Sequence, residues 1–466
     1  MKTCICLYFG IFILAFSLTG CAALMHTPYQ TPQVTLPSTW THQGEINGSA
    51  QDRWWEEFGD LALNHLVAEA LQRNNDLAAA TIRVRQAQLQ AEQAGSERLP
   101  SFSVQGNGEI SRYLGSGNRE IRNAAASAAV SYELDLWGKL GSSYGAARWE
   151  AMATEEDRAG TALSLIGTTA SFYWQIGSLN QRIRQSEASI AYARKTLQLV
   201  QVQKTAGAAS SLEILEAEGN LASQEASHTI LIQQRVEARN GLAILFDGPP
   251  QSLKTTEPQD LSQATVPKVS AGLPAHLLGR RPDLRAAEAR LRAALANTDA
   301  TRASFYPAIN LSGQLGGSSE QLARFLSNPL ATLGADLALP FVQWRDMQRN
   351  IKISEAEYEQ AIISFRQTLY NALADVENSL SARQQYREQA LKLEQTLSAA
   401  KQTEELYRIR YQAGGSALKS WLDAQENRRQ AEIALAENRL NQLQNHITLS
   451  KALGGGSAFV PAPTKG

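Results

Sequence analysis

Four segments of this chain alternate apolar and polar residues with a period of two. They are residues 101–112, 127–136, 309–315 and 332–341. In the first of them Phe102, Val104 and Ile110 fall on one face together with two glycines, and polar side chains occupy the other face. Such alternation over about ten residues is typical of a strand that crosses an outer membrane, although the edge strand of a soluble sandwich alternates as well.

Helical patterns fill most of the remaining chain. A first helix is predicted at about 60–98, and its second-half counterpart at about 276–305; each stops before a proline, because the residue before proline avoids the helical conformation. Longer patterns run from about 140 to 205 and from about 347 to 412. At 1.5 Å per residue, about 65 helical residues extend over about 100 Å.

Glycine-containing turns follow the two long helices, and return helices follow the turns. The turns contain Gly207 and the pair Gly414-Gly415, and the return helices are predicted at about 211–246 and 418–453. In the first long helix Ile176, Ile183 and Ile190 lie seven residues apart, which predicts an a/d seam for packing against another helix.

One constant offset of 207 residues relates the two halves of the chain. It connects Asp76 with Asp283 (283 − 76 = 207), and it connects Trp137 with Trp344 in the same way. We therefore predict a tandem duplication with the same order of elements in each copy. The predicted divisions are a lead-in at 21–59, repeat 1 at 60–250, a Pro/Ser/Thr-rich linker at 251–267, repeat 2 at 268–456 and a flexible tail at 457–466.

The first twenty residues read as a signal peptide. Lys2 precedes a nearly continuous apolar run at residues 5–18, which is too short for a comfortable transmembrane helix. The sequence Leu18-Thr19-Gly20-Cys21 resembles a bacterial lipobox, so Cys21 is expected to become the lipidated first residue; the alternative is an ordinary signal peptide with a chance cysteine. No later stretch has 18 consecutive apolar residues, so a membrane crossing by the mature chain would need β-strands.

Composition removes several classes of function. Lys plus Arg is 44 and Asp plus Glu is 45, and this balance argues against nucleic-acid binding. The three cysteines cannot form a disulfide framework, and the six scattered histidines show no metal-ligand spacing. Ser416 and Lys419 match S-x-x-K by count, but the motifs that accompany it in acyl-enzymes are absent. We expect no enzyme activity, no metal site and no cofactor beyond the lipid.

Two strands in each repeat give four per chain, which is too few for a membrane barrel. About eight strands are the smallest closed barrel, and open sheet edges do not occur in lipid. The barrel is therefore expected to be shared between copies: three chains would give 3 × 4 = 12 strands, and two would give a cramped eight. An envelope coiled-coil protein that serves only as an interaction module would explain the helices, but neither the signal peptide nor the strands.

Four motifs carry a resemblance to a known family. They are Tyr132-Glu133-Leu134-Asp135-Leu136-Trp137-Gly138-Lys139, the segment from Arg281-Pro282-Asp283-Leu284 to Ser304-Phe305-Tyr306-Pro307, Leu422-Asp423-Ala424-Gln425, and Lys451-Ala452-Leu453-Gly454-Gly455-Gly456. Together they resemble the outer-membrane factor family, the TolC-like exit ducts, in its OprM/CusC-type lipoprotein branch. The resemblance covers nearly all of residues 21–456.

The resemblance implies a mainly α fold with a β-barrel part. In this family a homotrimer forms a twelve-stranded barrel in the outer membrane, and long helical hairpins form a periplasmic tunnel. The implied function is a passive exit duct for drugs, toxic compounds or metal ions. It would work with a periplasmic adaptor protein and an inner-membrane pump of the resistance-nodulation-division type. The alternative is a TolC-like duct for type I protein secretion.

The resemblance also implies a periplasmic gate at the helix tips. Asp423 matches the acidic gate residue of the family, and Glu216 is its repeat counterpart (423 − 207 = 216). Lys419 stands where the OprM-like pattern has an apolar residue. Residues four apart share a helix face, so Lys419 and Asp423 are expected to pair within or between chains, unless they form only a solvated surface pair.

The same resemblance assigns the adaptor contact to the turns. These turns contain Gly207, Gly414 and Gly415, which also suit a simple helix C-cap.

Overall fold

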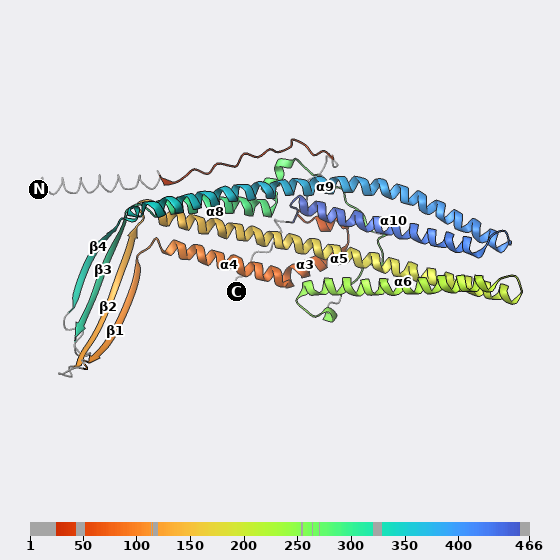
Figure 1. Cartoon of the computed structure of the whole chain (residues 1–466), viewed down its shortest axis with the longest axis horizontal. Helices are drawn as coiled ribbons and strands as arrows, with labels where there is room; N and C mark the ends of the chain where they lie inside the picture. Colours follow the sequence, from red (N-terminus) through yellow and green to blue (C-terminus); the bar gives the residue numbers. More distant parts are fainter. Residues whose placement is uncertain are drawn as a thin grey trace. The chain divides into compact units, whose positions relative to one another are not determined.

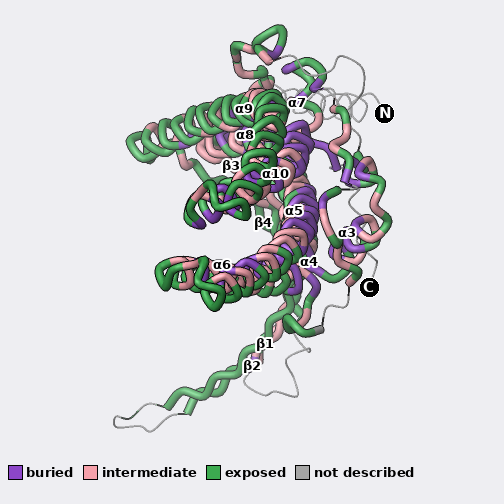
Figure 2. Tube along the Cα trace, turned by 90° about the vertical axis from the view of Figure 1, so that its right-hand side faces the viewer, coloured by how far each residue is buried: buried purple, intermediate pink, exposed green. Residues whose placement is uncertain are grey.

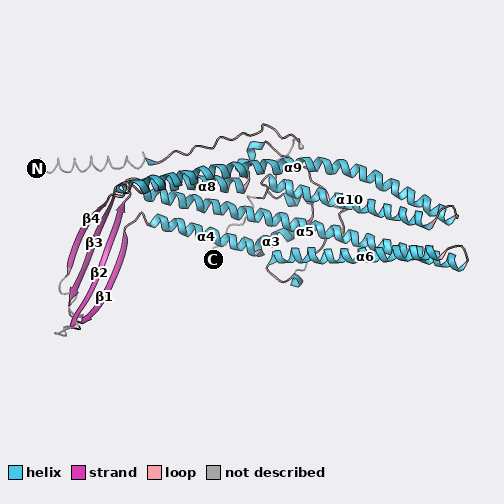
Figure 3. Cartoon of the chain, viewed as in Figure 1, coloured by secondary structure: helices cyan, strands magenta, loops and turns pink. Residues whose placement is uncertain are grey.

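The structure is a computed structural model that describes residues 25–42, 52–112, 114, 120–252, 255–262, 264–269, 271–319 and 329–456. Long helices and one small sheet make up the described chain (Figure 1, Figure 3). In the first half the elements are η1 (Trp54–Phe58), α3 (Leu61–Arg73), α4 (Asn75–Ser96), β1 (Ser101–Arg112), β2 (Glu120–Leu134), α5 (Lys139–Thr205), α6 (Ser211–Ala243), η2 (Ile244–Phe246) and η3 (Pro250–Ser252). In the second half they are η4 (Pro274–His276), α7 (Leu277–Arg280), α8 (Pro282–Ala303), β3 (Ala308–Ser319), β4 (Leu330–Ala338), η6 (Pro340–Val342), α9 (Trp344–Gln412) and α10 (Leu418–Ala452).

The chain divides into two compact units, each assembled from separate stretches of sequence. The first unit comprises residues 1–34, 82–155 and 286–367 and contains all four strands. The second comprises residues 35–81, 156–285 and 368–466 and contains both helical turns. Helices α5 and α9 contribute to both units.

In the first unit the strands form one antiparallel sheet in the order β1-β2-β3-β4. The register pairs Ser101 with Ser131 across β1 and β2, and Asn310 with Glu133 across β3 and β2. Within the described chain β1 and β4 each pair on one side only, so each leaves an open edge. The bounds of β1 agree with the segment predicted at 101–112.

The apolar side chains of the sheet lie in solvent in the single chain. Phe102 is 82% exposed and Leu333 is 91% exposed, and every residue of β1 and β4 is classed as exposed (Figure 2). Large apolar side chains usually lie in a core, so a sheet that displays them along two strands has a surface that requires a partner or a lipid environment.

Strand β2 is displaced from its predicted position. The alternation predicted it at 127–136, whereas it spans Glu120–Leu134. Its alanine-rich first half carries little alternation, but it pairs with β1 and β3 on both sides. The strand ends before Asp135, because the Asp135 carboxylate accepts hydrogen bonds from the backbone N–H groups of Leu140 (3.0 Å) and Gly141 (2.7 Å) and so caps the start of α5.

The predicted first helix of each half was wrong in one respect, since each is broken. Residues 60–98 form α3 and α4, separated at Asn74, whose backbone is extended (ψ 129°) and whose side-chain Oδ1 accepts from Leu77 N (3.0 Å). In the second half Arg281 is extended (ψ 123°) between α7 and α8, because it precedes Pro282.

Corresponding elements begin at a constant distance along the chain. Helix α8 begins 282 − 75 = 207 residues after α4, and β3 begins 308 − 101 = 207 residues after β1. Two of the sequence motifs also meet in the first unit: the indole of Trp137 donates to the Pro307 carbonyl (2.7 Å) and its ring lies 4.9 Å from that of Tyr306.

The core of the second unit forms around α5. The seam residues Ile176, Ile183 and Ile190 are buried, as the heptad spacing predicts. The largest apolar cluster also contains Trp54, Trp55 and Phe58 from η1, which pack onto Trp174 of α5. The lead-in residues before α3 are therefore part of this core.

None of the described helices carries an apolar stretch long enough to cross a membrane.

His446 of α10 lies in this core without a hydrogen bond among the described residues. Its ring is fully buried and lies 5.0 Å from the ring of Phe58 and 6.2 Å from that of Trp54. Burial, with a smaller contribution from the positive charge of Arg383, lowers the pKa of His446 to about 3. Glu57 lies 4.0 Å away, but the two do not form an ion pair because His446 is neutral at pH 7.

Acid should therefore destabilise the second unit through His446. The unfolded chain gains a proton on this ring below about pH 6.5 and the folded chain does not, so stability falls as the pH drops from 6.5 towards 3. Between pH 7 and pH 5 we expect a loss of about 2 kcal/mol that is absent in His446→Leu, measured from urea unfolding in detergent. His65→Leu, which changes an exposed histidine, is the control. Equal pH dependence in wild type and His446→Leu would contradict this assignment.

Candidate functional site: the tips of the helical hairpins

Two antiparallel hairpins, α5–α6 and α9–α10, each end in a tight turn in the second unit (Figure 1). In the first turn Gly207 is left-handed (φ 78°), its N–H donates to Lys204 O (3.0 Å) and the next N–H donates to Gln203 O (2.7 Å). These two hydrogen bonds define a Schellman motif, which satisfies carbonyls at the end of α5.

The second turn repeats this geometry. Gly414 is left-handed (φ 72°), its N–H donates to Tyr411 O (2.9 Å), and Gly415 N–H donates to Arg410 O (2.7 Å). Gly415 itself has no positive φ, and a Cβ built there would meet only Arg410 O at 3.4 Å. Gly207 and Gly414 are therefore required for the turns, and Gly415 is not.

A small aromatic core joins the two tips within one chain. The Trp421 ring of α10 lies 5.4 Å from the Tyr411 ring of α9 and 6.3 Å, edge to face, from the Tyr192 ring of α5. The buried members of this tip core are Val200, Ala217, Tyr411, Leu418, Trp421 and Leu422. Because they come from α5, α6, α9 and α10, the core fixes the two hairpins against each other.

Polar contacts surround the tip core. The Tyr411 hydroxyl donates to Gln203 Oε1 (2.7 Å), and burial together with the charge of Glu213 raises its pKa to about 12. The carboxylate of Glu404, only 7% exposed, lies 3.1 Å from the guanidinium of Arg428, which also stands over the Tyr192 ring. Sequence analysis missed this core, although aromatic residues on both sides of the second turn were a visible signal.

The structure brings Lys419 and Asp423 together. Lys419 Nζ lies 3.1 Å from Asp423 Oδ1, with the two side chains 68% and 59% exposed. Both residues stand on the face of α10 opposite Leu418 and Trp421, so they point away from the tip core. A pair this exposed contributes little to stability, because water screens the two charges.

Glu216 stands at the corresponding place on α6. Its neighbour Ala217 lies in the tip core, and Glu216 itself is half-buried. Among the described residues it makes no ion pair or hydrogen bond. The expected lipidation site, Cys21, lies outside the residues that the structure describes.

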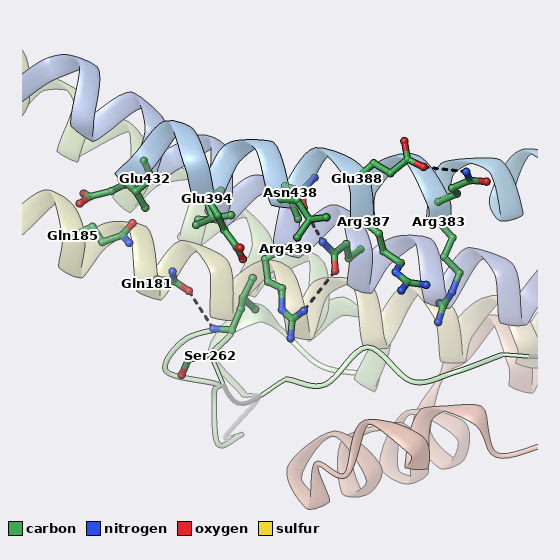
Figure 4. Close-up of a pocket in the computed structure, with 18 of the residues that line it drawn as sticks. Gln181, Gln185, Ser262, Arg383, Arg387, Glu388, Glu394, Glu432, Asn438 and Arg439 are labelled. Carbon is green, nitrogen blue, oxygen red and sulfur yellow. Dashed lines mark hydrogen bonds between the residues drawn. The ribbon is translucent and has the colours of Figure 1, made fainter. Parts of the chain in front are cut away.

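A cavity of about 950 Å³ lies farther from the turns, among α5, α9, α10 and the linker. Figure 4 shows Arg383 and Arg387 of α9 and Arg439 of α10 directed into it. Arg383 donates to Pro267 O (2.6 Å), and Arg439 donates to Ala264 O. These guanidinium groups hold the linker against α9 and α10, which gives the cavity a structural explanation. Among the described residues no three His, Cys, Asp or Glu side chains gather into a potential metal site.

The two glycines of the second turn provide a matched pair for mutation. Gly414→Ala places a Cβ in a left-handed conformation, which costs about 1 kcal/mol and should raise the local opening of the turn roughly fivefold. Hydrogen exchange of the peptide that contains residues 410–417 measures this change. Gly415→Ala should leave the exchange nearly unchanged; an equal effect of both substitutions would contradict the assigned geometry.

Comparison with known proteins agrees with this architecture. The model of the outer membrane efflux protein family matches residues 66–246 and 273–455. The pyoverdine export outer membrane protein OpmQ of Pseudomonas aeruginosa is 33% identical over 435 residues, which cover 91% of this chain and 92% of that protein.

Two solved channel structures are similar over nearly the whole chain. The outer-membrane channel OprN has a TM-score of 0.85 at 25% identity and covers 93% of this chain and 99% of its own. CusC, described for its transmembrane channel formation, has a TM-score of 0.84 at 26% identity and covers 92% and 99%. With both halves of its sequence matched by the family model and its fold shared with these channels, the chain belongs to the outer membrane efflux protein family.

Proposed function

We propose that this chain is the passive exit duct of a tripartite efflux system in the outer membrane. Three copies would combine their sheets into one twelve-stranded barrel, and their hairpins would line a periplasmic tunnel. Small molecules such as drugs, toxic compounds or metal ions would leave through it. An inner-membrane pump, expected to be of the resistance-nodulation-division type, would supply the energy through a periplasmic adaptor protein.

The sheet is the observation that carries this proposal. Its four strands leave the outer edges of β1 and β4 unpaired in the described chain, and its large apolar side chains are exposed. Edge N–H and C=O groups need partners in lipid, where no water can satisfy them. Pairing β1 of one copy with β4 of the next satisfies both edges at once and closes the sheet.

The internal repeat supports the same assembly. The two segments that match the family model begin 273 − 66 = 207 residues apart, which agrees with the spacing of the corresponding helices and strands. We infer that a duplicated unit supplies two strands and one hairpin per copy. Three duplicated chains then place six similar units around one axis.

Contacts of the N-terminal lead-in support a membrane anchor on Cys21. Thr27, six residues further on (27 − 21 = 6), donates from its backbone N to Asp299 (2.9 Å) and from Oγ1 to the same carboxylate (2.6 Å). The Asp299 side chain is almost fully buried, so it holds the lead-in firmly on α8. A lipid on Cys21 would thereby be tied to the unit that contains the strands.

The two turns are the proposed contact with the adaptor, and α10 is the proposed gate. Gly207, Gly414 and Gly415 lie at the ends of the hairpins, where no other described element covers them. Asp423 and Lys419 lie on the outward face of α10 one to two helical turns from its start, with Glu216 at the matching place on α6. Type I protein secretion would use the same scaffold, and no feature of the described residues favours it over efflux.

Reconstitution tests the duct directly. The purified mature protein should form a trimer by native mass spectrometry and conduct ions in planar bilayers. Deletion of the gene should increase sensitivity to some antibiotics, dyes, solvents or metals. A stable monomer without conductance would contradict the proposal.

Asp423→Ala tests the proposed gate. Removal of the carboxylate breaks its contact with Lys419 and should raise single-channel conductance, since charge contacts of helices at the constriction hold it closed. Asp346→Ala, which removes an exposed carboxylate at the other end of the α9 sequence, should leave conductance unchanged. Unchanged conductance in Asp423→Ala would exclude this residue from the gate.

Cys21→Ala tests the lipid anchor. The wild-type protein should incorporate labelled palmitate and the variant should not, because the acyl chains are attached through this cysteine. The variant should keep its fold, since no described contact depends on the lipid. Equal labelling of the two proteins would contradict the lipobox assignment.

A further inference from the structure

The outward face of α10 at its tip carries balanced charges. Lys419 contacts Asp423 at 3.1 Å, and one turn further Arg429 contacts Glu426 at 2.5 Å. Burial would raise the pKa of Glu426, but hydrogen bonds from Arg429 and Gln430 lower it, so this carboxylate stays ionised. Two acids and two bases therefore share this part of the helix, with a formal sum of zero.

The other repeat has a different arrangement at the matching positions. Leu212 corresponds to Lys419 (419 − 207 = 212) and Glu216 corresponds to Asp423. Leu212 is 64% exposed, and Glu216 has no cationic partner among the described residues. The same helix position thus combines an apolar residue with an unpaired acid on α6, and a base with a paired acid on α10.

This difference matters because a ring of like charges selects ions. Three uncompensated carboxylates around one axis attract cations and exclude anions, as acidic rings do in cation channels. A lysine 3.1 Å from each carboxylate cancels most of its field at distances greater than the pair itself. The two charges then leave only a weak dipole toward the bore.

We propose that Lys419 sets the charge selectivity of the constriction, making it passable for small organic anions as well as for cations. The proposal rests on the exit-duct function and on α10 forming the constriction. Leu418, Trp421 and Leu422 hold one face of α10 in the tip core, so the opposite face with Lys419 and Asp423 is the one available to the bore. Lys419 acts there as a specificity-determining residue, through its contact with Asp423.

Reversal potentials in a tenfold KCl gradient measure this selectivity in planar bilayers. Wild type should show a K⁺/Cl⁻ permeability ratio near one. Lys419→Leu, which copies the arrangement of Leu212, leaves Asp423 uncompensated and should raise the ratio at least about threefold. Asp423→Asn should lower it below one, and the double variant Lys419→Leu/Asp423→Asn should return it near the wild-type value.

Two further variants separate this effect from a general loss of charge. Lys419→Arg keeps a cation at the same place and should keep the wild-type ratio. Lys392→Leu removes an exposed lysine of α9 about five helical turns from its end, and it should also keep the ratio. The inhibition of chloride flux by Lys419→Leu should extend to an organic anion such as benzoate.

The outcomes distinguish this inference from the proposed function. A conducting wild type that is already strongly cation-selective, or an unchanged ratio in Lys419→Leu, would overturn the role of Lys419 and leave the duct intact. A trimer without conductance would contradict the duct itself, and with it the role of Lys419.

Discussion

The open edges of the sheet impose the strongest constraint on this molecule. Backbone N–H and C=O groups along β1 and β4 face outward without partners in the described chain, next to exposed apolar side chains. Water can satisfy such groups and hydrocarbon cannot. A chain that brings this sheet into a membrane therefore needs the edges of other chains, and membership of a family of outer-membrane channels fits that need. The proposed trimer follows from this requirement more than from any single residue.

The second constraint is the tip core, which determines where charges can act. Trp421, Tyr411 and Tyr192 bring the ends of two hairpins together, and the two left-handed glycines allow those hairpins to turn tightly. Once one face of α10 is buried in this core, the charged residues on the other face can only point outward. A hydrophobic contact within one chain thus fixes the orientation of the proposed gate.

Much of the fold could be predicted because its signals are local. The period-two segment at 101–112 became β1 with the same bounds, and the long helical patterns became α5 and α9 within a few residues. Gly207 and Gly414 marked both turns, and the spacing of Lys419 and Asp423 predicted their contact. The breaks at Asn74 and Arg281 and the early start of β2 were not predicted, because capping by one side chain and pairing on both sides of a strand leave little trace in hydrophobic periodicity.

The sequence by itself determined the class of the protein: its family motifs, its alternating strands, its helical hairpins and the candidate residues on them are all properties of short stretches of chain. Only the tertiary structure decided which residues share the tip core, that Asp423 has a partner while Glu216 has none, and that the linker is held by Arg383 and Arg439. These facts join positions far apart in the sequence. They arise when apolar faces of different helices are buried together, and the resulting geometry cannot be read from periodicity along one helix.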